Sequence, residues 1–134
     1  MENKDVRWQQ RFQSFEKAFL FFKSAVDKEN YTPIEIGGLV RSLDSTFELG
    51  WKTLEQYLYE QDFNITYPRE IIKIGFQLKI IGDSDTWLCI LQKCNELSHI
   101  YDETIAKQAV RIIKFQYYHA IEHVYCRLKE IQSE

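Results

Sequence analysis

The 134-residue sequence contains few of the residues that interrupt a chain, and it has no long hydrophobic segment. Only 2 prolines and 5 glycines are present, which excludes linkers and low-complexity regions. The longest apolar run, residues 18–22, is much shorter than the roughly 20 residues that cross a bilayer. The polar N-terminus lacks the apolar stretch of a signal peptide. We therefore expect a single domain over residues 1–134, cytoplasmic and with no membrane partner.

Cysteines and clustered basic residues are scarce as well. An odd number of cysteines, 3, in a chain without an export signal predicts reduced thiols. The net charge is -3, and no run of lysines and arginines forms the basic face that binding to a long duplex requires. A chain of this length buries enough surface to fold without disulfides or metal. These absences argue against a general duplex-binding protein and leave a short contact with RNA open.

Aromatic residues, in contrast, are abundant and make up 15% of the chain. Near the N-terminus, apolar side chains recur at alternating steps of four and three residues, which is the spacing of one face of an α-helix. We interpret this aromatic stripe as bundle core or dimer interface rather than as a cofactor site, since each buried side chain contributes about 1.5–3 kcal/mol to packing. Its members are Trp8, Phe12, Phe15, Phe19, Phe22 and Val26.

Helical spacing continues along most of the remaining sequence. A second helix is expected over residues 33–61, because Thr32 is a good N-cap and a proline follows at the first helical position. Further helices are expected at about residues 69–80, 84–97 and 102–131. No segment alternates with a period of two, so no strand is expected. The sequence therefore predicts an all-α fold, an antiparallel four-helix up-and-down bundle with an extra short helix.

One group of residues near the C-terminus has the spacing of a zinc site. His119, Glu122 and His123 match the H-x-x-E-H pattern of a zinc-peptidase class, but that class needs a third ligand well downstream, and we favour a polar helix edge. No phosphate-binding glycine loop and no Ser-His-Asp arrangement is visible in the sequence. We therefore expect neither a metal nor a cofactor.

The spacings of the cysteines and of two carboxylates do not predict a metal site either. Cys89, Cys94 and His99 are five residues apart, and each such step turns about 140° around a helix, so they cannot converge on one metal unless the helix breaks. We expect small buried thiols instead. Asp44 and Glu48 lie one turn apart beside the apolar face of the second helix, either as solvated carboxylates or as a pair that lines a polar pocket.

Residues 93–103 concentrate the polar chemistry of the chain. Amide, hydroxyl, imidazole, phenol and carboxylate groups follow one another within three turns. On composition alone, a helix C-terminus followed by the capping residue Asp102 accounts for most of this pattern. The alternative is a functional site at an interrupted helix end.

This segment resembles the sequence signature of the nucleotidyltransferase substrate-binding proteins, a branch of the HEPN superfamily that includes HepT-like proteins. Two further stretches match in order and spacing, so that the resemblance extends over about residues 5–128. They are residues 47–54, and Pro68, Arg69 and Glu70 with Gly82, Asp83 and Trp87. The residues at the signature positions are Asn95, Ser98, His99, Tyr101, Asp102 and Glu103.

The resemblance implies a helical bundle that forms a homodimer and pairs with a small, MntA-like nucleotidyltransferase, in some cases as toxin and antitoxin. HEPN toxins are metal-independent ribonucleases, and the dimer brings two Arg–His motifs together across a cleft. In the toxin pairs, the nucleotidyltransferase silences the ribonuclease by adding AMP to the tyrosine two residues after the motif histidine. His99 and Tyr101 are the matching residues here.

The chain departs from the family at the motif arginine, whose position holds Cys94. A neutral thiol cannot supply the positive fork that holds a scissile phosphate. Lys93 is adjacent, but on a continuous helix it would point about 100° away. The departure therefore weakens the expectation of ribonuclease activity.

Two hypotheses follow. The first is a non-catalytic dimeric partner that presents a substrate or acceptor site around His99 and Tyr101, with Tyr101 as the site of modification. The second is a HEPN-type ribonuclease in which Lys93 or another cation replaces the arginine and His99 is the catalytic acid or base. The bound RNA or nucleotide stays open in both. The residues expected to contact it are Lys93, Asn95, Ser98, Tyr101, Asp102 and Glu48.

Overall fold

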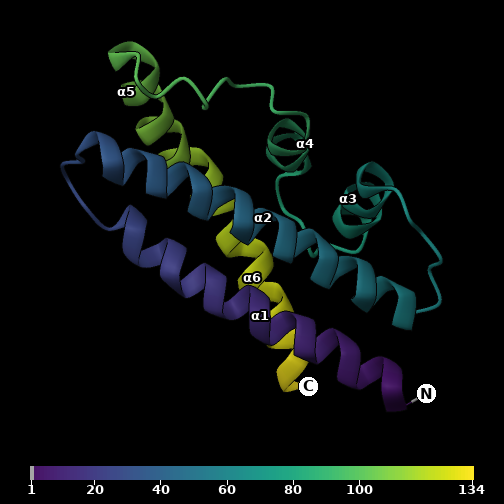
Figure 1. Ribbon diagram of the computed structural model, residues 1–134. Coiled ribbons are helices and arrows are strands. Elements are labelled where there is room, and N and C mark those ends of the chain that lie inside the picture. Colours follow the sequence, from purple (N-terminus) through teal and green to yellow (C-terminus); the bar gives the residue numbers. More distant parts are fainter. Residues whose placement is uncertain (1) are drawn as a thin grey trace.

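The computed structural model describes residues 2–134, with side chains from residue 7 onward. Every regular element in this range is helical, as the sequence predicts, and the helices form a bundle (Figure 1). Within the same range no helix combines the length and apolarity that a membrane span needs. The elements are α1 (Glu2–Val26), α2 (Pro33–Glu60), α3 (Pro68–Gln77), α4 (Ser84–Gln92), α5 (Glu103–Ile112), the π-helical segment η1 (Ile113–Tyr117) and α6 (Tyr118–Ser133).

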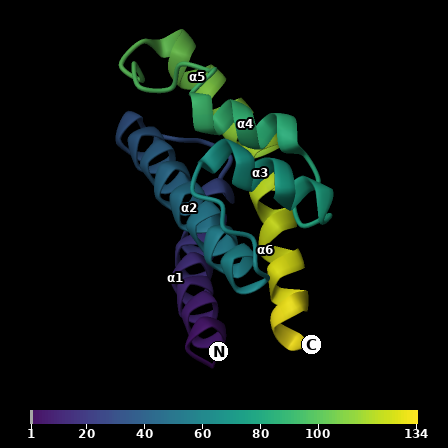
Figure 2. The ribbon, with the colours of Figure 1, turned by 90° about the vertical axis from the view of Figure 1, so that its right-hand side faces the viewer.

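α1 and α2 form a long antiparallel pair that crosses α6, and both termini lie at the same end of the molecule (Figures 1 and 2). All six members of the aromatic stripe are buried, with exposed fractions between 0% and 9%. The Tyr125 ring of α6 stacks on Phe12 and Phe19, with ring centroids 5.7 and 4.4 Å apart. Tyr118 of α6 also stacks on Phe19. The stripe is therefore core of the bundle, which decides between the two interpretations left open by the sequence.

The beginning of α2 follows the predicted capping pattern. The Glu35 backbone N–H donates to Thr32 Oγ1 at 3.2 Å, and the Thr32 N–H donates to the Glu35 carboxylate at 2.8 Å, so both groups of a capping box are satisfied. Farther along α2, a Cβ at Gly50 would lie 3.0 Å from the Phe15 ring and 3.3 Å from the Trp87 ring. Close helix packing thus explains why this glycine is tolerated inside a helix.

α3 and α4 are shorter than expected, because two lysines in left-handed conformation reverse the chain. α3 ends at Gln77, and Lys79 has φ 64°, so the reversal precedes the predicted stop at Gly82. α4 ends at Gln92, five residues before the predicted end, because Lys93 has φ 53°. Both helices lie on the side of α2 that faces away from α1 (Figures 1 and 2). A lysine carries no sequence signal for this conformation, which is why helical periodicity predicts both helix ends several residues too late.

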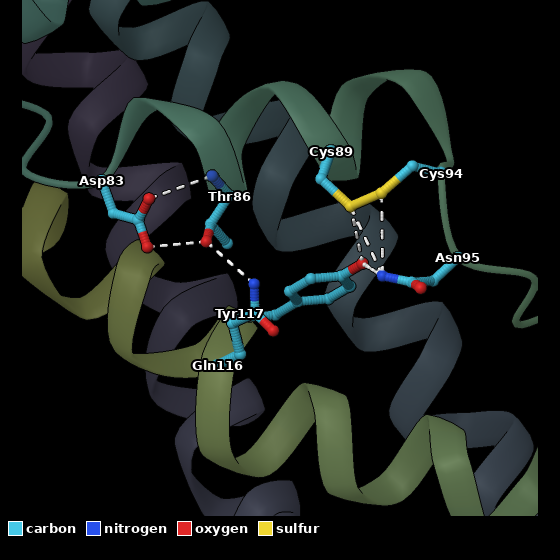
Figure 3. The surroundings of a disulfide bond; sticks show 7 residues. All are labelled: Asp83, Thr86, Cys89, Cys94, Asn95, Gln116 and Tyr117. Carbon is cyan, nitrogen blue, oxygen red and sulfur yellow. Dashed lines mark hydrogen bonds between the residues drawn. A yellow bond between two sulfur atoms is a disulfide. The ribbon is translucent and has the colours of Figure 1, made fainter.

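The predicted last helix is continuous but contains one wide turn. In η1 the Tyr118 backbone N–H donates to the Ile113 carbonyl, an i to i−5 hydrogen bond. The wider turn shifts the helix face, so Gln116 and Tyr117 both reach towards α4 (Figure 3). Buried residues along this long element, such as Ile113 and Leu128, anchor it in the core.

Candidate functional site

Residues 93–102 connect α4 to α5 without regular structure at the end of the molecule opposite the two termini (Figures 1 and 2). α4 is fixed at its beginning by Asp83, whose carboxylate accepts from the Thr86 N–H at 3.1 Å and the Thr86 hydroxyl at 2.6 Å. Trp87 is fully buried and donates its indole N–H to the Ala120 carbonyl at 3.1 Å. α5 is capped at its beginning by Asp102, whose carboxylate accepts from the Thr104 N–H at 2.9 Å. The irregular segment is therefore held between two capped helices.

His99 and Tyr101 form a hydrogen-bonded pair on the surface of this segment. His99 Nδ1 lies 2.7 Å from the Tyr101 hydroxyl, and the two rings meet edge-to-face with centroids 5.4 Å apart. Tyr101 is 83% exposed, which is unusual for an aromatic side chain. An imidazole that accepts a phenol proton can act as a general base for that oxygen. The pair thus places an imidazole nitrogen within hydrogen-bonding distance of an accessible phenol.

A pocket of about 160 Å³ lies between α2, the end of α4 and the irregular segment, and its lining extends to Ser98, the residue before His99. It brings together three residues predicted to bind substrate, Lys93, Asn95 and Ser98, and adds Asp44 from α2. Its remaining walls are Val40, Leu43, Ile90, Glu96, Leu97 and Tyr117. Because the pocket joins one cation, two carboxylates and an amide over an apolar floor, it suits a ligand with both polar and flat apolar parts.

A shallower hollow on α2 continues from the pocket and shares Asp44 and Ser98 with it. The hollow includes Arg41, an exposed cation that the sequence reasoning missed. Arg41 precedes Asp44 by three residues and therefore lies on the same helix face, a spacing that would have been the signal. Together they extend the polar surface from the pocket along α2.

Within the segment, Glu96 is held by Ser98. The Ser98 backbone N–H donates to the Glu96 carboxylate at 2.6 Å, and the Ser98 hydroxyl donates to the same oxygen. These hydrogen bonds, the hydroxyl first, lower the pKa of the Glu96 carboxyl. Glu96 therefore stays ionised in the lining of the pocket, which also contains Lys93.

Three other residues considered from the sequence lie outside the pocket or make local structural contacts. Glu48 lies on α2 and pairs with Lys52 at 3.7 Å, and it does not line the pocket. Asp102 caps α5. His119 lies 3.8 Å from Glu122, as expected for a polar helix edge. Among the residues whose side chains are described, no three His, Cys, Asp or Glu groups converge to hold a metal ion.

The expectation of three reduced thiols is wrong for two of them, because Cys89 and Cys94 form a disulfide with their Cα atoms 5.1 Å apart (Figure 3). The helix breaks between them at Lys93, so the rotation of 140° expected on a continuous helix does not apply. For the same reason, Lys93 is not turned away from the segment but lines the pocket. Cys126 is a free, exposed thiol.

The disulfide contacts a partly buried polar cluster. The Asn95 side-chain amide donates to the Tyr117 hydroxyl at 2.6 Å, and that hydroxyl lies 3.3 Å from Cys89 Sγ. Tyr117 itself is only 2% exposed. Because η1 positions Tyr117, the cluster connects the last long helix to the beginning of the irregular segment (Figure 3).

Comparisons with known proteins add a family and a fold. Residues 10–130 match the family described as nucleotidyltransferase substrate binding protein like. A protein of Thermus thermophilus with a solved crystal structure is similar in fold, with a TM-score of 0.74 and 24% sequence identity over 86% of this chain and 98% of that one. No curated protein matches the sequence significantly.

Proposed function

Because this chain belongs to the nucleotidyltransferase substrate binding protein like family, we propose that it is the non-catalytic, substrate-presenting partner of a separate minimal nucleotidyltransferase. The family match extends over most of the chain and implies a nucleotidyltransferase partner. Within this role, residues 93–102 carry the presented site, and Tyr101 is the acceptor of the transferred nucleotide.

The observation that carries the proposal is the hydrogen bond between His99 and Tyr101. A phenol is a weak nucleophile when protonated, and a neighbouring imidazole that takes its proton makes attack on an activated phosphate feasible. With Tyr101 83% exposed, a partner active site can enclose the side chain without unfolding the bundle.

The adjacent pocket is the second part of the proposal. Its volume of about 160 Å³ is below the range of roughly 300–1,000 Å³ typical of whole-ligand sites. We therefore assign it to one portion of a ligand, such as a nucleobase, while the hollow with Arg41 takes a phosphate. Lys93 at the pocket and Arg41 at the hollow are the cations available to a phosphate, and the Asp44 and Glu96 carboxylates in the pocket are available as acceptors for the base or the sugar.

The acceptor role is tested by intact-protein mass spectrometry. The protein is first incubated with ATP, Mg²⁺ and the nucleotidyltransferase that is encoded nearest to it. We expect the wild type to gain the mass of at least one AMP group and Tyr101→Phe to gain none. Tyr67→Phe is the matched control, because Tyr67 is also exposed, at 68%, but lies at the beginning of α3 and outside residues 93–102. Loss of the gain in the Tyr67 variant, or its persistence in the Tyr101 variant, would contradict the assignment.

A HEPN-type ribonuclease is the second candidate, and one observation favours it. Lys93 lies in the pocket lining together with Asn95 and Ser98, so a cation is present in the segment that carries His99. This hypothesis predicts RNA cleavage and growth arrest on expression, both abolished in His99→Ala. Intact RNA and normal growth with the wild-type protein would exclude it.

A further inference from the structure

The turn after α4 brings Cys89 and Cys94 together through backbone hydrogen bonds alone. The Cys94 N–H donates to the Cys89 carbonyl at 3.0 Å, and the Lys93 N–H donates to the Ile90 carbonyl at 3.2 Å. This is the bonding pattern of a helix that ends in a left-handed residue. Since the backbone holds the two Cα atoms 5.1 Å apart, the pair is arranged for bond formation without a large chain movement.

The cluster around the sulfurs has a defined donor and acceptor order. A disulfide sulfur carries no proton, so the Tyr117 hydroxyl is the donor in its 3.3 Å contact with Cys89 Sγ. The same hydroxyl accepts from the Asn95 amide, which also lies 3.4 Å from Cys89 Sγ and 3.7 Å from Cys94 Sγ. Asn95 therefore contacts both sulfurs and the phenol, and it lines the pocket as well.

We propose that the Cys89–Cys94 pair is a reversible redox switch that sets the position of residues 95–101 and thereby controls the pocket and acceptor site of the proposed function. A non-bonded pair of heavy atoms needs about 3.5–4.0 Å, whereas a disulfide holds its sulfurs at about 2.05 Å. On reduction the sulfurs move apart by more than an ångström. The Asn95 amide, which contacts both sulfurs in the oxidised form, then loses this arrangement and is free to shift.

The segment that follows Asn95 is suited to transmit such a shift. It contains no regular helix between residues 94 and 102, and its contact with α2 includes Ile100, which packs at Gly37. A short loop closed by the disulfide constrains the unfolded chain less than a long one, so its main effect is local. Lys93, Asn95 and Ser98 would therefore change their spacing in the pocket while the bundle core stays intact.

The chemistry is thiol–disulfide exchange with a dithiol reductant. A reductant thiolate attacks Cys94 Sγ, since Cys94 is exposed and Cys89 is half-buried, and the electron pair of the broken S–S bond passes to Cys89 Sγ. The Tyr117 hydroxyl stabilises that thiolate by hydrogen bonding. The second reductant thiolate then displaces Cys94, so the reductant leaves as a disulfide and its two protons remain on the cysteine pair. The reverse exchange, with an oxidised dithiol, restores the bond.

The test uses the full chain with Cys126→Ala, which removes the free exposed thiol and its intermolecular disulfides. The protein is equilibrated with graded ratios of reduced and oxidised dithiothreitol and quenched by alkylation, and mass spectrometry counts the alkyl groups. We expect a transition from zero to two groups across the series. In a time course with excess reduced dithiothreitol and the same quench, reduction should be on the order of tenfold slower in Tyr117→Phe, because the thiolate loses a hydrogen bond. Absence of oxidation at any ratio would overturn the proposal.

The proposed movement of residues 95–101 is measured by hydrogen exchange of the same samples, without any nucleotidyltransferase. On reduction, amides of residues 95–101 should exchange at least about tenfold faster, with α1 and α2 unchanged, and Cys89→Ala should behave as the reduced form under both conditions. Unchanged exchange, or an equal rise throughout the chain, would make the bond merely structural. AMP addition to Tyr101 is then compared between the oxidised and the reduced protein. If neither form accepts AMP, the result counts against the proposed function alone. If both forms accept AMP equally, the proposed redox control of the site is overturned.

Discussion

Lys93 combines two roles in one residue, since it ends α4 in a left-handed conformation and places its charge in the pocket. A left-handed residue with a side chain is disfavoured by roughly 1–2 kcal/mol, and glycine avoids that cost but is more flexible when unfolded. Lys93→Gly should therefore raise the free energy of unfolding by about 0.5–1 kcal/mol in urea titrations, while nucleotide binding measured by calorimetry falls.

Lys79 provides the matched control for this substitution. It also has a positive φ, 64°, and it does not line the pocket. Lys79→Gly should give a similar gain in stability and leave nucleotide binding unchanged. A loss of stability in Lys93→Gly would mean that side-chain contacts of Lys93 outweigh the backbone conformation.

Between elements, α1 and α6 are joined by a polar clasp as well as by aromatic stacking. Glu16 accepts from Lys129 at 2.6 Å and from the Tyr125 hydroxyl at 2.5 Å. These hydrogen bonds, that of Lys129 first, lower the pKa of Glu16, while burial acts in the opposite direction. A carboxyl with a lowered pKa in the folded state stabilises the fold above its unfolded pKa, and this contribution is lost as the pH falls through the folded value.

Glu16→Gln should accordingly be less stable than the wild type at neutral pH, with a difference that shrinks on acidification. The change is expected below about pH 4.3, the ordinary pKa of a glutamate, and is complete once the lower pKa of the folded state is passed. Urea unfolding of both proteins at a series of pH values measures it. A difference independent of pH would show that packing, and not ionisation, holds the clasp.

For the whole molecule, we propose a homodimer. Phe21 of α1 and Phe115 of η1 are 68% and 72% exposed, which is apolar area that a second copy can cover. Phe21→Glu with Phe115→Glu should shift the protein to a monomer in light scattering coupled to gel filtration, with circular dichroism unchanged. Ile34→Glu is the control, because Ile34 is 87% exposed at the beginning of α2. A dimer that survives the paired substitution would place the interface elsewhere.

The bundle was predictable from the sequence, because amphipathic spacing and caps are local. The aromatic stripe of α1 and the Thr32 cap each depend on residues within a few turns, so periodicity sufficed to place α1 and α2. Residues 95–103 could also be identified from the sequence as a candidate site, because they form a contiguous polar segment. Their individual contacts could not be predicted, as the capping role of Asp102 and the distance of Glu48 from the pocket illustrate.

The way in which that segment is held, in contrast, depends on contacts between distant parts of the chain. The disulfide depends on the left-handed Lys93, and the cluster behind it depends on the wide turn of η1, which brings Tyr117 to Asn95 across 22 residues of sequence. Neither feature has a local sequence signal, since a lysine is not expected in that conformation and a single extra residue in a helical turn leaves apolar spacing almost unchanged. Local spacing and motifs are thus sufficient to identify the helices and the family. The pocket arises only when α4 packs against η1 and α2, because its walls come from elements that meet only in the folded chain.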